Sequence, residues 1–348
     1  MVSNYYHVIA LQVLLACTLY GTQFVSPDQY KESILVLKLQ TKLTIKEMHH
    51  LEHSYNINAL AFSPNDKYLA VGDDKGAVLW DPSKGNKEKT FDTYKSVVSQ
   101  VFFTPDGEKL VGIYREFGGG TTKMWDIASG REIFSKPKTG IFGILPNGKE
   151  FVSHAEGIAR FHDVKTFDVI RQFRILPTAV GIDWVALSPD GKMIANGSSI
   201  DKTIKTWSVD FGGEFATLKG HKVILRGLSF SKTGKWVAAI GGDNAVRLWN
   251  SKTGELIYTV TLEGRPTSMA LSADEKWLAV GIATPPNHKL AIYEAAKGME
   301  AFAVGLKSGA IRAIEFDSKT NVIACASGKT VQLFTFTTDT EKKPMKSK

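Results

Sequence analysis

The sequence has few cysteines and no apolar run long enough to cross a bilayer. Its 348 residues include two cysteines, Cys17 and Cys325, which excludes a disulfide framework and a multi-cysteine zinc or iron–sulfur site. The longest mostly apolar segment, residues 8–20, is shorter than the ~20 residues that a transmembrane helix needs. Hydrophobic residues (43%) and charged residues (22%) occur at ordinary levels, which argues against wholesale disorder and against a multi-span membrane protein.

Residues 8–20, VIALQVLLACTLY, have the length of a signal-peptide core. Residues 14–17, Leu-Leu-Ala-Cys, also resemble a lipobox, in which the cysteine becomes lipid-modified. Against export, no Lys or Arg precedes this run, and Leu15 is bulky for its lipobox position. We therefore assign residues 1–33 to a leader that is a signal peptide or a lipoprotein-like segment. The alternative is that the apolar run is a buried strand or an unpaired leader. Cytoplasmic and exported locations both stay open, and membrane contact is expected only through a lipidated Cys17.

The excess of positive charge is concentrated at the carboxyl end. The net charge is +8, and four of the 43 basic residues lie in the last seven positions, KKPMKSK. Half of the excess therefore belongs to a Lys-rich tail, residues 339–348, which we expect to be disordered. Aromatic and basic residues are not interleaved as single-stranded nucleic-acid platforms require, so a nucleic-acid partner is not expected.

One short phrase recurs along the chain: an apolar run, a turn of the type Ser/Thr-Pro-Asp/Asn-Gly-Lys, and a second apolar run. The turns begin at residues 63, 104, 145, 188, 231, 272 and 317. Pro fixes φ in such a turn, Asp or Asn tolerates the tight bend, and Gly accepts a positive φ. Each phrase therefore predicts two antiparallel strands joined by a tight turn.

A second phrase, centred on an aromatic residue or His, follows each of these hairpins. Its central residues are at positions 80, 125, 162, 207, 249, 293 and 334. In several units a Gly turn and one more strand follow it. The repeating unit is therefore four strands over about 42 residues, which is the signature of a repeat architecture.

These phrases resemble the WD-repeat β-propeller family over residues 57–337. The Trp-Asp pair of that family is intact at Trp80-Asp81 and Trp125-Asp126. The resemblance also matches Trp207, Trp249, the Gly-His residue His221 and the turn aspartates Asp74, Asp201 and Asp243. It implies structural roles for these residues in a His–Ser–Asp–Trp hydrogen-bond network. No unit carries the whole set, and His221, Asp243 and Trp249 are the nearest to it.

The expected fold is an all-β, seven-bladed β-propeller of four-stranded antiparallel sheets, spanning residues 34–338. The seventh unit lacks a fourth strand, and we expect residues 42–52 to complete it. An irregular eighth blade is the competing count, because residues 25–28 echo the turn phrase and residues 34–40 have no place in seven blades. The chain is expected to be monomeric by itself.

The first strand of each unit predicts where a partner binds. One and three residues before each turn the side chains are apolar, which predicts a buried face. Five residues before each turn none is apolar: Asn58, Ser99, Gly140, Asp183, Arg226, Thr267 and Arg312. We expect these residues to open the first strands and to ring the mouth of a central channel. They are either solvated strand ends or a binding rim.

Three further residues are candidates for partner contacts. Trp184, beside Asp183, is an aromatic anchor for a partner. Arg115 and Phe117 lie in a loop that departs from the repeat length.

The leading functional hypothesis is a non-enzymatic scaffold that binds a peptide or protein on one propeller face, as WD-repeat propellers typically do. The sequence offers no catalytic residues, metal ligands or cofactor motif. Two alternatives stay open: a propeller enzyme with a central metal or acid–base site, and binding of an anionic ligand or nucleic acid through basic residues. The sequence names neither the partner nor the pathway.

Overall fold

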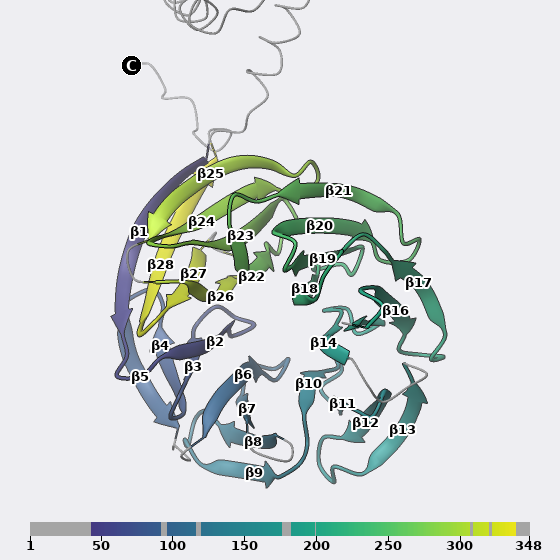
Figure 1. Cartoon of the computed structure of the whole chain (residues 1–348). Coiled ribbons are helices and arrows are strands. Elements are labelled where there is room, and N and C mark those ends of the chain that lie inside the picture. Colours follow the sequence, from purple (N-terminus) through teal and green to yellow (C-terminus); the bar gives the residue numbers. More distant parts are fainter. Residues whose placement is uncertain are drawn as a thin grey trace, which may run out of the picture. The chain divides into compact units, whose positions relative to one another are not determined.

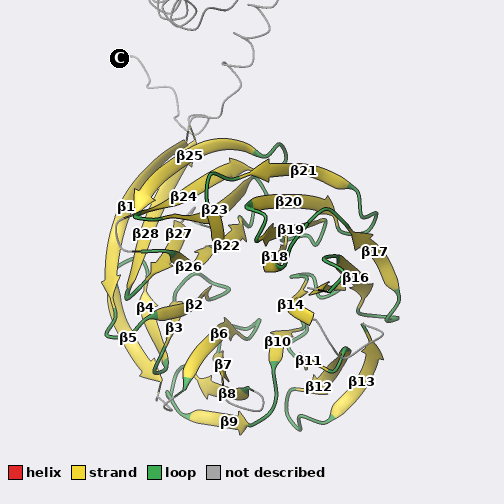
Figure 2. Ribbon diagram, viewed as in Figure 1, coloured by secondary structure: helices red, strands yellow, loops and turns green. Residues whose placement is uncertain are grey.

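The structure is a computed structural model that describes residues 43–91, 96–115, 120–175, 182–198, 200–306, 309–319 and 322–338. Within these ranges all regular secondary structure is β-strand, arranged as seven four-stranded sheets around a central axis (Figures 1 and 2). The predicted seven-bladed, all-β propeller is confirmed, and the count of eight blades is wrong. The proposed leader (1–33), residues 34–42 and the Lys-rich tail (339–348) lie outside the described residues.

Each blade runs from an inner strand beside the axis to an outer strand at the circumference of the propeller. The inner strands are β2 (Ile57–Phe62), β6 (Val97–Phe103), β10 (Ile141–Ile144), β14 (Ile182–Leu187), β18 (Leu225–Phe230), β22 (Arg265–Leu271) and β26 (Ile311–Phe316). The second strands are β3 (Leu69–Asp73), β7 (Lys109–Arg115), β11 (Glu150–Ala155), β15 (Met193–Ser198), β19 (Trp236–Gly241), β23 (Trp277–Thr284) and β27 (Val322–Ser327).

The third strands are β4 (Ala77–Asp81), β8 (Thr121–Asp126), β12 (Ile158–Asp163), β16 (Ile204–Ser208), β20 (Ala245–Asn250), β24 (Asn287–Glu294) and β28 (Thr330–Thr338). The outer strands are β5 (Asn86–Phe91), β9 (Glu132–Lys136), β13 (Val169–Arg174), β17 (Glu214–Leu218), β21 (Leu256–Thr261), β25 (Met299–Leu306) and β1 (Leu43–Glu52). Blades 1 to 7 are numbered here in the order of their inner strands.

The turn phrase of the sequence connects the first and second strands of each blade, and its side chains stabilise the bend. In blade 4, Ser188 Oγ donates a hydrogen bond to Asp190 Oδ1 at 2.6 Å and accepts one from Met193 N at 2.8 Å. Gly191 has a φ of 72°, a conformation in which residues with a Cβ are strained. The turn therefore depends on its serine and aspartate as hydrogen-bonding groups, as well as on the tolerance for tight bends expected from the sequence.

The first and last strands of the propeller close the ring together. Strand β1 pairs antiparallel with β28 from Leu43 opposite Thr338 to Glu52 opposite Thr330, and the two lie side by side in Figure 1 in purple and yellow. Blade 7 thus has the strand order β1-β28-β27-β26. The sequence analysis predicted residues 42–52 as the strand that completes the seventh blade. Because β1 supplies the outer strand of blade 7, both ends of the repeat region contribute to one sheet.

The hydrophobic core lies between neighbouring blades. One cluster, for example, joins Leu79 and Phe91 of blade 1 to Val98, Leu110 and Trp125 of blade 2. The other clusters are also built largely across blade boundaries. A single sheet therefore cannot bury its own apolar faces, and each blade is stabilised by its neighbours.

Leu51, in β1, tests how much the closing strand contributes. Its side chain is 2% exposed and packs in the cluster between blades 7 and 1. We expect Leu51→Ala to lower the free energy of unfolding by about 2–5 kcal/mol, because it removes buried methyl groups and leaves a cavity. Urea denaturation followed by circular dichroism measures this. As a control, Ile133→Ala, at a side chain 47% exposed, should change the free energy by less than about 0.5 kcal/mol. Equal effects of the two variants would contradict the role of β1.

Candidate functional site

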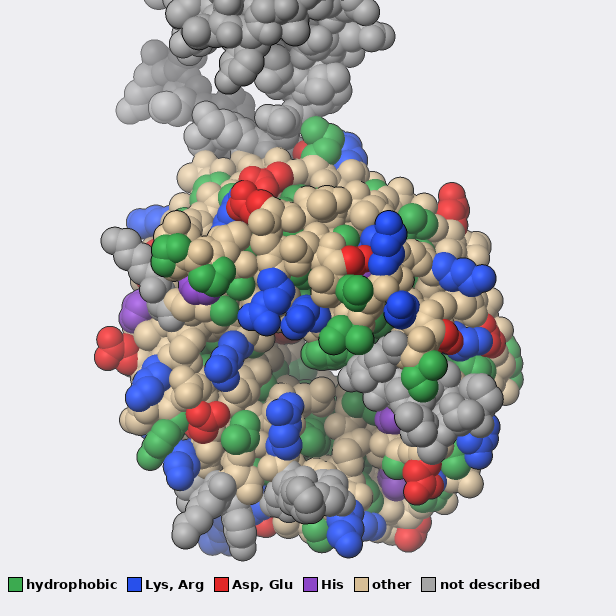
Figure 3. Space-filling model, viewed as in Figure 1, with side chains coloured by type: hydrophobic (Ala, Val, Ile, Leu, Met, Phe, Trp, Pro, Cys, Tyr) green, Lys and Arg blue, Asp and Glu red, His purple; other side chains and the backbone are tan. Residues whose placement is uncertain are grey.

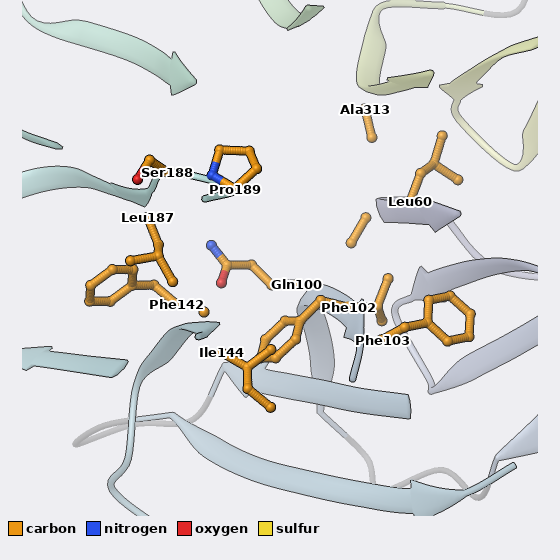
Figure 4. Close-up of a pocket in the computed structure, with 13 residues that line it drawn as sticks. Leu60, Gln100, Phe102, Phe103, Phe142, Ile144, Leu187, Ser188, Pro189 and Ala313 are labelled. Carbon is orange, nitrogen blue, oxygen red and sulfur yellow. The ribbon is translucent and has the colours of Figure 1, made fainter. Parts of the chain in front are cut away.

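A channel runs between the inner strands. One cavity of about 530 Å³ is lined by inner-strand residues of blades 1 to 4 and 7, and the side chain of Gln100 extends into it (Figure 4). A second cavity, of about 420 Å³, shares Phe102, Phe103 and Pro189 with the first and reaches the turns that follow the inner strands. We call the end where the inner strands begin the mouth face and the end with these turns the turn face.

The residues predicted to ring the mouth are β-bulge residues. The pairing register of the inner strand shifts at six of them: Asn58, Ser99, Asp183, Arg226, Thr267 and Arg312. In blade 3 the shift falls at Phe142, and Gly140 precedes β10.

The bulges correct two parts of the sequence analysis. The six residues lie one or two positions inside their strands and do not open them. The strand openings are instead anchored by buried residues immediately before five of the bulges: Ile57, Val98, Leu225, Pro266 and Ile311. An extra residue in one strand breaks the alternation of its side chains, so the six residues do not continue the face formed by the residues one and three positions before each turn.

Asn58 and Arg312 tie blade 7 to blade 1 across the mouth. Arg312 Nη1 donates to Asn58 Oδ1 at 3.1 Å, and Asn58 Nδ2 donates to Asp74 Oδ1 at 2.9 Å. Asn56 Nδ2 donates to the other oxygen of Asp74 at 3.1 Å. Arg312 therefore bonds to a neutral amide, and its side chain keeps its positive charge at an exposed position.

Arg226 and Trp184 lie together at the boundary of blades 4 and 5. Trp184 is 39% exposed, and its Nε1 donates to the carbonyl of Leu225 at 3.1 Å. Arg226 is half-buried, and its Nε is enclosed without a hydrogen-bond partner among the described residues. A buried donor without a partner is costly.

The remaining predicted contact residues are less well defined. Asp183 lies in β14, but its side chain is outside the description. Arg115 ends β7 and is exposed, whereas Phe117 lies outside the described residues. The structure therefore places Trp184 against the backbone of Leu225, next to Arg226, and joins Asn58 to Arg312. It leaves the proposed contacts of Asp183 and Phe117 undescribed.

The mouth face is positively charged near the channel. Figure 3 shows Lys and Arg side chains around the central opening. Within the described ranges, Arg226, Arg265 and Arg312 form no ion pair. Nearby Asp243, in contrast, is engaged by Arg247 at 2.7 Å. The rim therefore presents guanidinium groups that no carboxylate of the described chain neutralises.

A polar relay stabilises blade 1 from within. Trp80 Nε1 donates to His53 Nε2 at 3.0 Å, and His53 Nδ1 lies 3.4 Å from Asp73 Oδ2. Asp73 Oδ1 accepts the backbone N–H groups of Lys75 and Gly76 at 2.8 and 2.9 Å. This relay differs from the expectation, which placed the turn aspartate at Asp74. Asp74 instead holds the rim amides.

The comparisons with known proteins identify the repeat. The WD domain, G-beta repeat family matches residues 45–81, 175–208 and 212–250, and the first match contains the His53–Asp73–Trp80 relay. The chain is a WD-repeat β-propeller.

Similar curated proteins come from organisms that are only distantly related to one another. The Periodic tryptophan protein 2 homolog of Dictyostelium discoideum is 25% identical over 57% of this chain and 17% of its own length. Apoptotic protease-activating factor 1 of Rattus norvegicus is 24% identical over 64% of this chain and 18% of its own. Nuclear distribution protein nudF of Aspergillus niger is 26% identical over 61% of this chain and 43% of its own. The chain thus spans less than half the length of these relatives.

The WD-repeat network in blade 5 differs from the expected one. His221 Nδ1 lies 3.0 Å from Asp243 Oδ1 and 2.7 Å from Arg247 Nη1. Trp249 Nε1 donates instead to the carbonyl of Lys219 at 3.0 Å, and its ring lies against that of His221. The histidine of blade 5 is therefore contacted by Arg247, whereas the histidine of blade 1 accepts from Trp80.

Other blades of this WD-repeat propeller use different partners at the same position. Trp207 Nε1 donates to the buried Asn196 Oδ1 at 2.6 Å. His162, which replaces tryptophan in blade 3, lies 2.7 Å from Ser153 Oγ through its Nε2, and burial lowers its pKa. Trp125 is buried against the rings of Phe91 and Tyr114.

The aspartates of the two intact Trp-Asp pairs cap turns. Asp81 accepts hydrogen bonds from the hydroxyl and the N–H of Ser83, and Asp126 accepts the same two bonds from Ser129. The hydroxyl of Ser83 is the main cause that lowers the pKa of Asp81 to about 2. These contacts give Asp81 and Asp126 a structural role in the turns to the outer strands.

The sequence analysis did not single out Glu315. This side chain faces the second cavity two residues before its turn, where the other blades carry Ala61, Phe102, Gly143, Ala186, Ser229 and Ala270. Burial raises its pKa to about 8, and the nearby Lys232 opposes this shift. A charged residue among small and apolar equivalents was the available clue. No cluster of three or more metal-ligating side chains occurs in the described part of the chain.

Asp73→Ala tests the relay in blade 1. The substitution leaves His53 and two backbone N–H groups without their acceptor, so we expect the free energy of unfolding to fall by about 1–3 kcal/mol. Urea denaturation measures it. Asp168→Ala, at an exposed aspartate, is the control and should stay within about 0.5 kcal/mol. A loss at Asp73 no larger than at Asp168 would show that the relay adds no stability.

Glu315 predicts a pH dependence of stability. Its pKa is about 8 in the folded chain and near its ordinary value of about 4.3 when unfolded, so the folded state binds more protons between these values. The free energy of unfolding should therefore fall as the pH rises from about 4.5 to 8. Denaturation at a series of pH values should show a smaller fall in Glu315→Gln than in the wild type. Glu108→Gln, at an exposed carboxylate, should keep the wild-type slope. The same slope in Glu315→Gln would contradict the prediction.

Proposed function

We propose that this WD-repeat propeller is a non-enzymatic interaction scaffold that binds a peptide or protein across its mouth face. WD-repeat propellers typically act as interaction scaffolds, and the chain has their fold. The observation that carries the proposal is the position of Trp184, whose Nε1 donates to the carbonyl of Leu225, the residue directly before Arg226. An arginine whose Nε lacks a partner lies at the same blade boundary as a partly exposed tryptophan, and these two residue types are enriched at the centres of interfaces.

The form of the mouth supports this proposal. The bulges occur at related positions in the inner strands, so the rim residues stand on a rigid ring. Rigid presentation reduces the entropy that is lost when a partner binds. Carboxylate, C-terminal and backbone carbonyl groups of a peptide are suitable acceptors for Arg226 and Arg312.

An enzymatic function has less support. The seven predicted rim positions hold one carboxylate residue, Asp183, and two arginines, whereas acid–base catalysis needs a proton donor and acceptor placed around one reacting centre. Glu315 faces the cavity nearer the turn face, among mostly apolar side chains. We therefore propose that this chain binds its partner without chemical conversion.

Nucleic-acid binding is the second candidate. A relative named U3 small nucleolar RNA-associated protein 15 homolog, from Xenopus tropicalis, is 22% identical over 76% of this chain and 56% of its own length. The unpaired arginines of the mouth would suit phosphates as well as carboxylates. Such binding should weaken steeply with salt and should be lost on nuclease treatment.

Site-specific crosslinking tests the mouth face as the partner site. A photoreactive amino acid replaces Trp184 in one variant and the outer-strand residue Leu256 in a control, and each is irradiated in lysate of the source cells. We expect discrete protein adducts at position 184 that resist nuclease. Adding Arg226→Glu and Arg312→Glu should reduce them about ten-fold, because the acceptors on the partner would then meet negative charge. Equal adducts at both positions, or no effect of the charge reversals, would refute the proposal.

A further inference from the structure

A groove on the turn face, at the boundary of blades 4 and 5, has no role in the proposed function. Its volume is about 480 Å³, which is in the range of sites that hold a few side chains. It lies between the start of β15 and the β16–β17 turn of blade 4, and the start of β19 and the β20–β21 turn of blade 5. We call it the 4/5 groove. It shares no lining residue with the mouth rim or with either channel cavity.

The 4/5 groove has an exposed aromatic wall. Phe211 is 71% exposed, the highest value among the large hydrophobic side chains of the described residues. Its ring lies edge-on to that of Phe215 at 5.7 Å between centroids. Two aromatic side chains beside a cavity form an exposed apolar surface. Its contact with water is unfavourable, and a partner that covers it gains free energy of binding.

The backbone around Phe211 holds this ring outward. Ser208 is buried, its Oγ accepts the N–H of Phe211 at 3.3 Å, and its carbonyl accepts the N–H of Gly212 at 3.0 Å. Gly212 has a φ of 67°, and a Cβ there would lie 2.8 Å from the ring of Phe173. The turn is therefore fixed by its own hydrogen bonds and by blade 3, so the exposure of Phe211 is built into the structure.

The two sides of the 4/5 groove are fixed relative to each other. Thr206 Oγ1 in blade 4 donates to the carbonyl of Ser251 in blade 5 at 2.7 Å. Ser251 Oγ in turn donates to the carbonyl of Gly234 at 2.6 Å. Both bonds are buried: the first joins the two blades, and the second fixes Ser251 within blade 5. The groove therefore exists before any ligand binds, which lowers the cost of binding.

Three lysines surround the apolar wall. Lys192, Lys235 and Lys252 line the groove and are exposed, and none of them forms an ion pair within the described residues. Of the two carboxylates in the lining, Asp190 already accepts hydrogen bonds from Ser188 Oγ and from the N–H of Lys192. The lining thus carries three lysines against two aspartates, Asp190 and Asp210, beside an aromatic surface, and Glu275 accepts two hydrogen bonds from the lining residue Thr233.

We propose that the 4/5 groove binds an acidic peptide segment in which one large apolar side chain packs against Phe211. Its carboxylates would lie near Lys192, Lys235 and Lys252, where opposite charge favours them. The basic carboxyl end of this chain, KKPMKSK, has the wrong charge to fill the groove, and we assign the acidic segment to a separate partner. This site is independent of the mouth face and would allow the propeller to hold two partners.

Fluorescence anisotropy tests the proposal on the full chain. The probe is a fluorescein-labelled peptide of about 12 residues, made of Asp and Glu with two Phe residues. We expect the probe to bind, and we expect its affinity to fall as the salt concentration rises. Phe211→Ala should raise the dissociation constant about ten-fold, as loss of an aromatic anchor does. The triple variant Lys192→Gln, Lys235→Gln, Lys252→Gln should raise it by a similar factor, because it removes every unpaired cation of the groove.

Matched variants and probes make the result decisive. Lys149→Gln and Ile133→Ala, at exposed residues outside the groove, should bind like the wild type, and so should the double variant Arg226→Glu, Arg312→Glu of the mouth. The double variant also separates this proposal from the proposed function, because it changes only the mouth-face adducts. A probe with Ala in place of Phe should bind about ten-fold more weakly.

Three outcomes would overturn the proposal. The first is no binding at about 1 mM probe. The second is equal binding by the wild type, Phe211→Ala and the lysine variant. The third is equal binding of the Phe and Ala probes together with full displacement by single-stranded oligothymidine, which would show a general site for polyanions.

Discussion

Burial of side chains between neighbouring sheets is the constraint on which the molecule depends. Each core cluster takes residues largely from adjoining blades, as Phe91 of blade 1 and Trp125 of blade 2 illustrate. A sheet that lost its neighbour would expose one whole apolar face, so the blades are stable only as a closed ring. Strand β1 completes the last sheet and so allows the ring to close. The rigid mouth and the fixed 4/5 groove both follow from this arrangement, because their residues are held by two blades at once.

Much of the architecture could be predicted from the sequence because it follows from local chemistry repeated seven times. The turn phrase at residues 188–192 requires particular backbone angles and hydrogen-bonding side chains, and each copy predicts the same hairpin. The aromatic phrase then marks the third strand, as at Trp80 and Trp249. Closure by residues 42–52 was predictable by elimination, since the last unit lacked a strand. Strand counting and alternation therefore sufficed for the fold, although the echo at residues 25–28 left eight blades open.

The site was less predictable because it depends on pairing between strands. A bulge such as that at Arg226 is a mismatch between two strands, and the sequence of one strand does not reveal it. His53 has no glycine before it, so the family dipeptide did not mark it, yet its place beside Asp73 and Trp80 completes the relay. Glu315 stands out only when its six equivalents are compared. The exposure of Phe211 depends on contacts from blade 3, far away in the sequence.

The pairing of β1 with β28 also brings the first and last strands of the propeller together. Leu43 lies directly opposite Thr338, so the two backbone ends of the propeller are neighbours across one ladder, where paired Cα atoms are about 5 Å apart. A short peptide could bridge them, and the chain could then be cut at any of the tight turns between strands without removing a hydrogen-bonded pair. The ring of blades is continuous although the polypeptide has two ends, so the propeller is suited to circular permutation and to the insertion of a second domain.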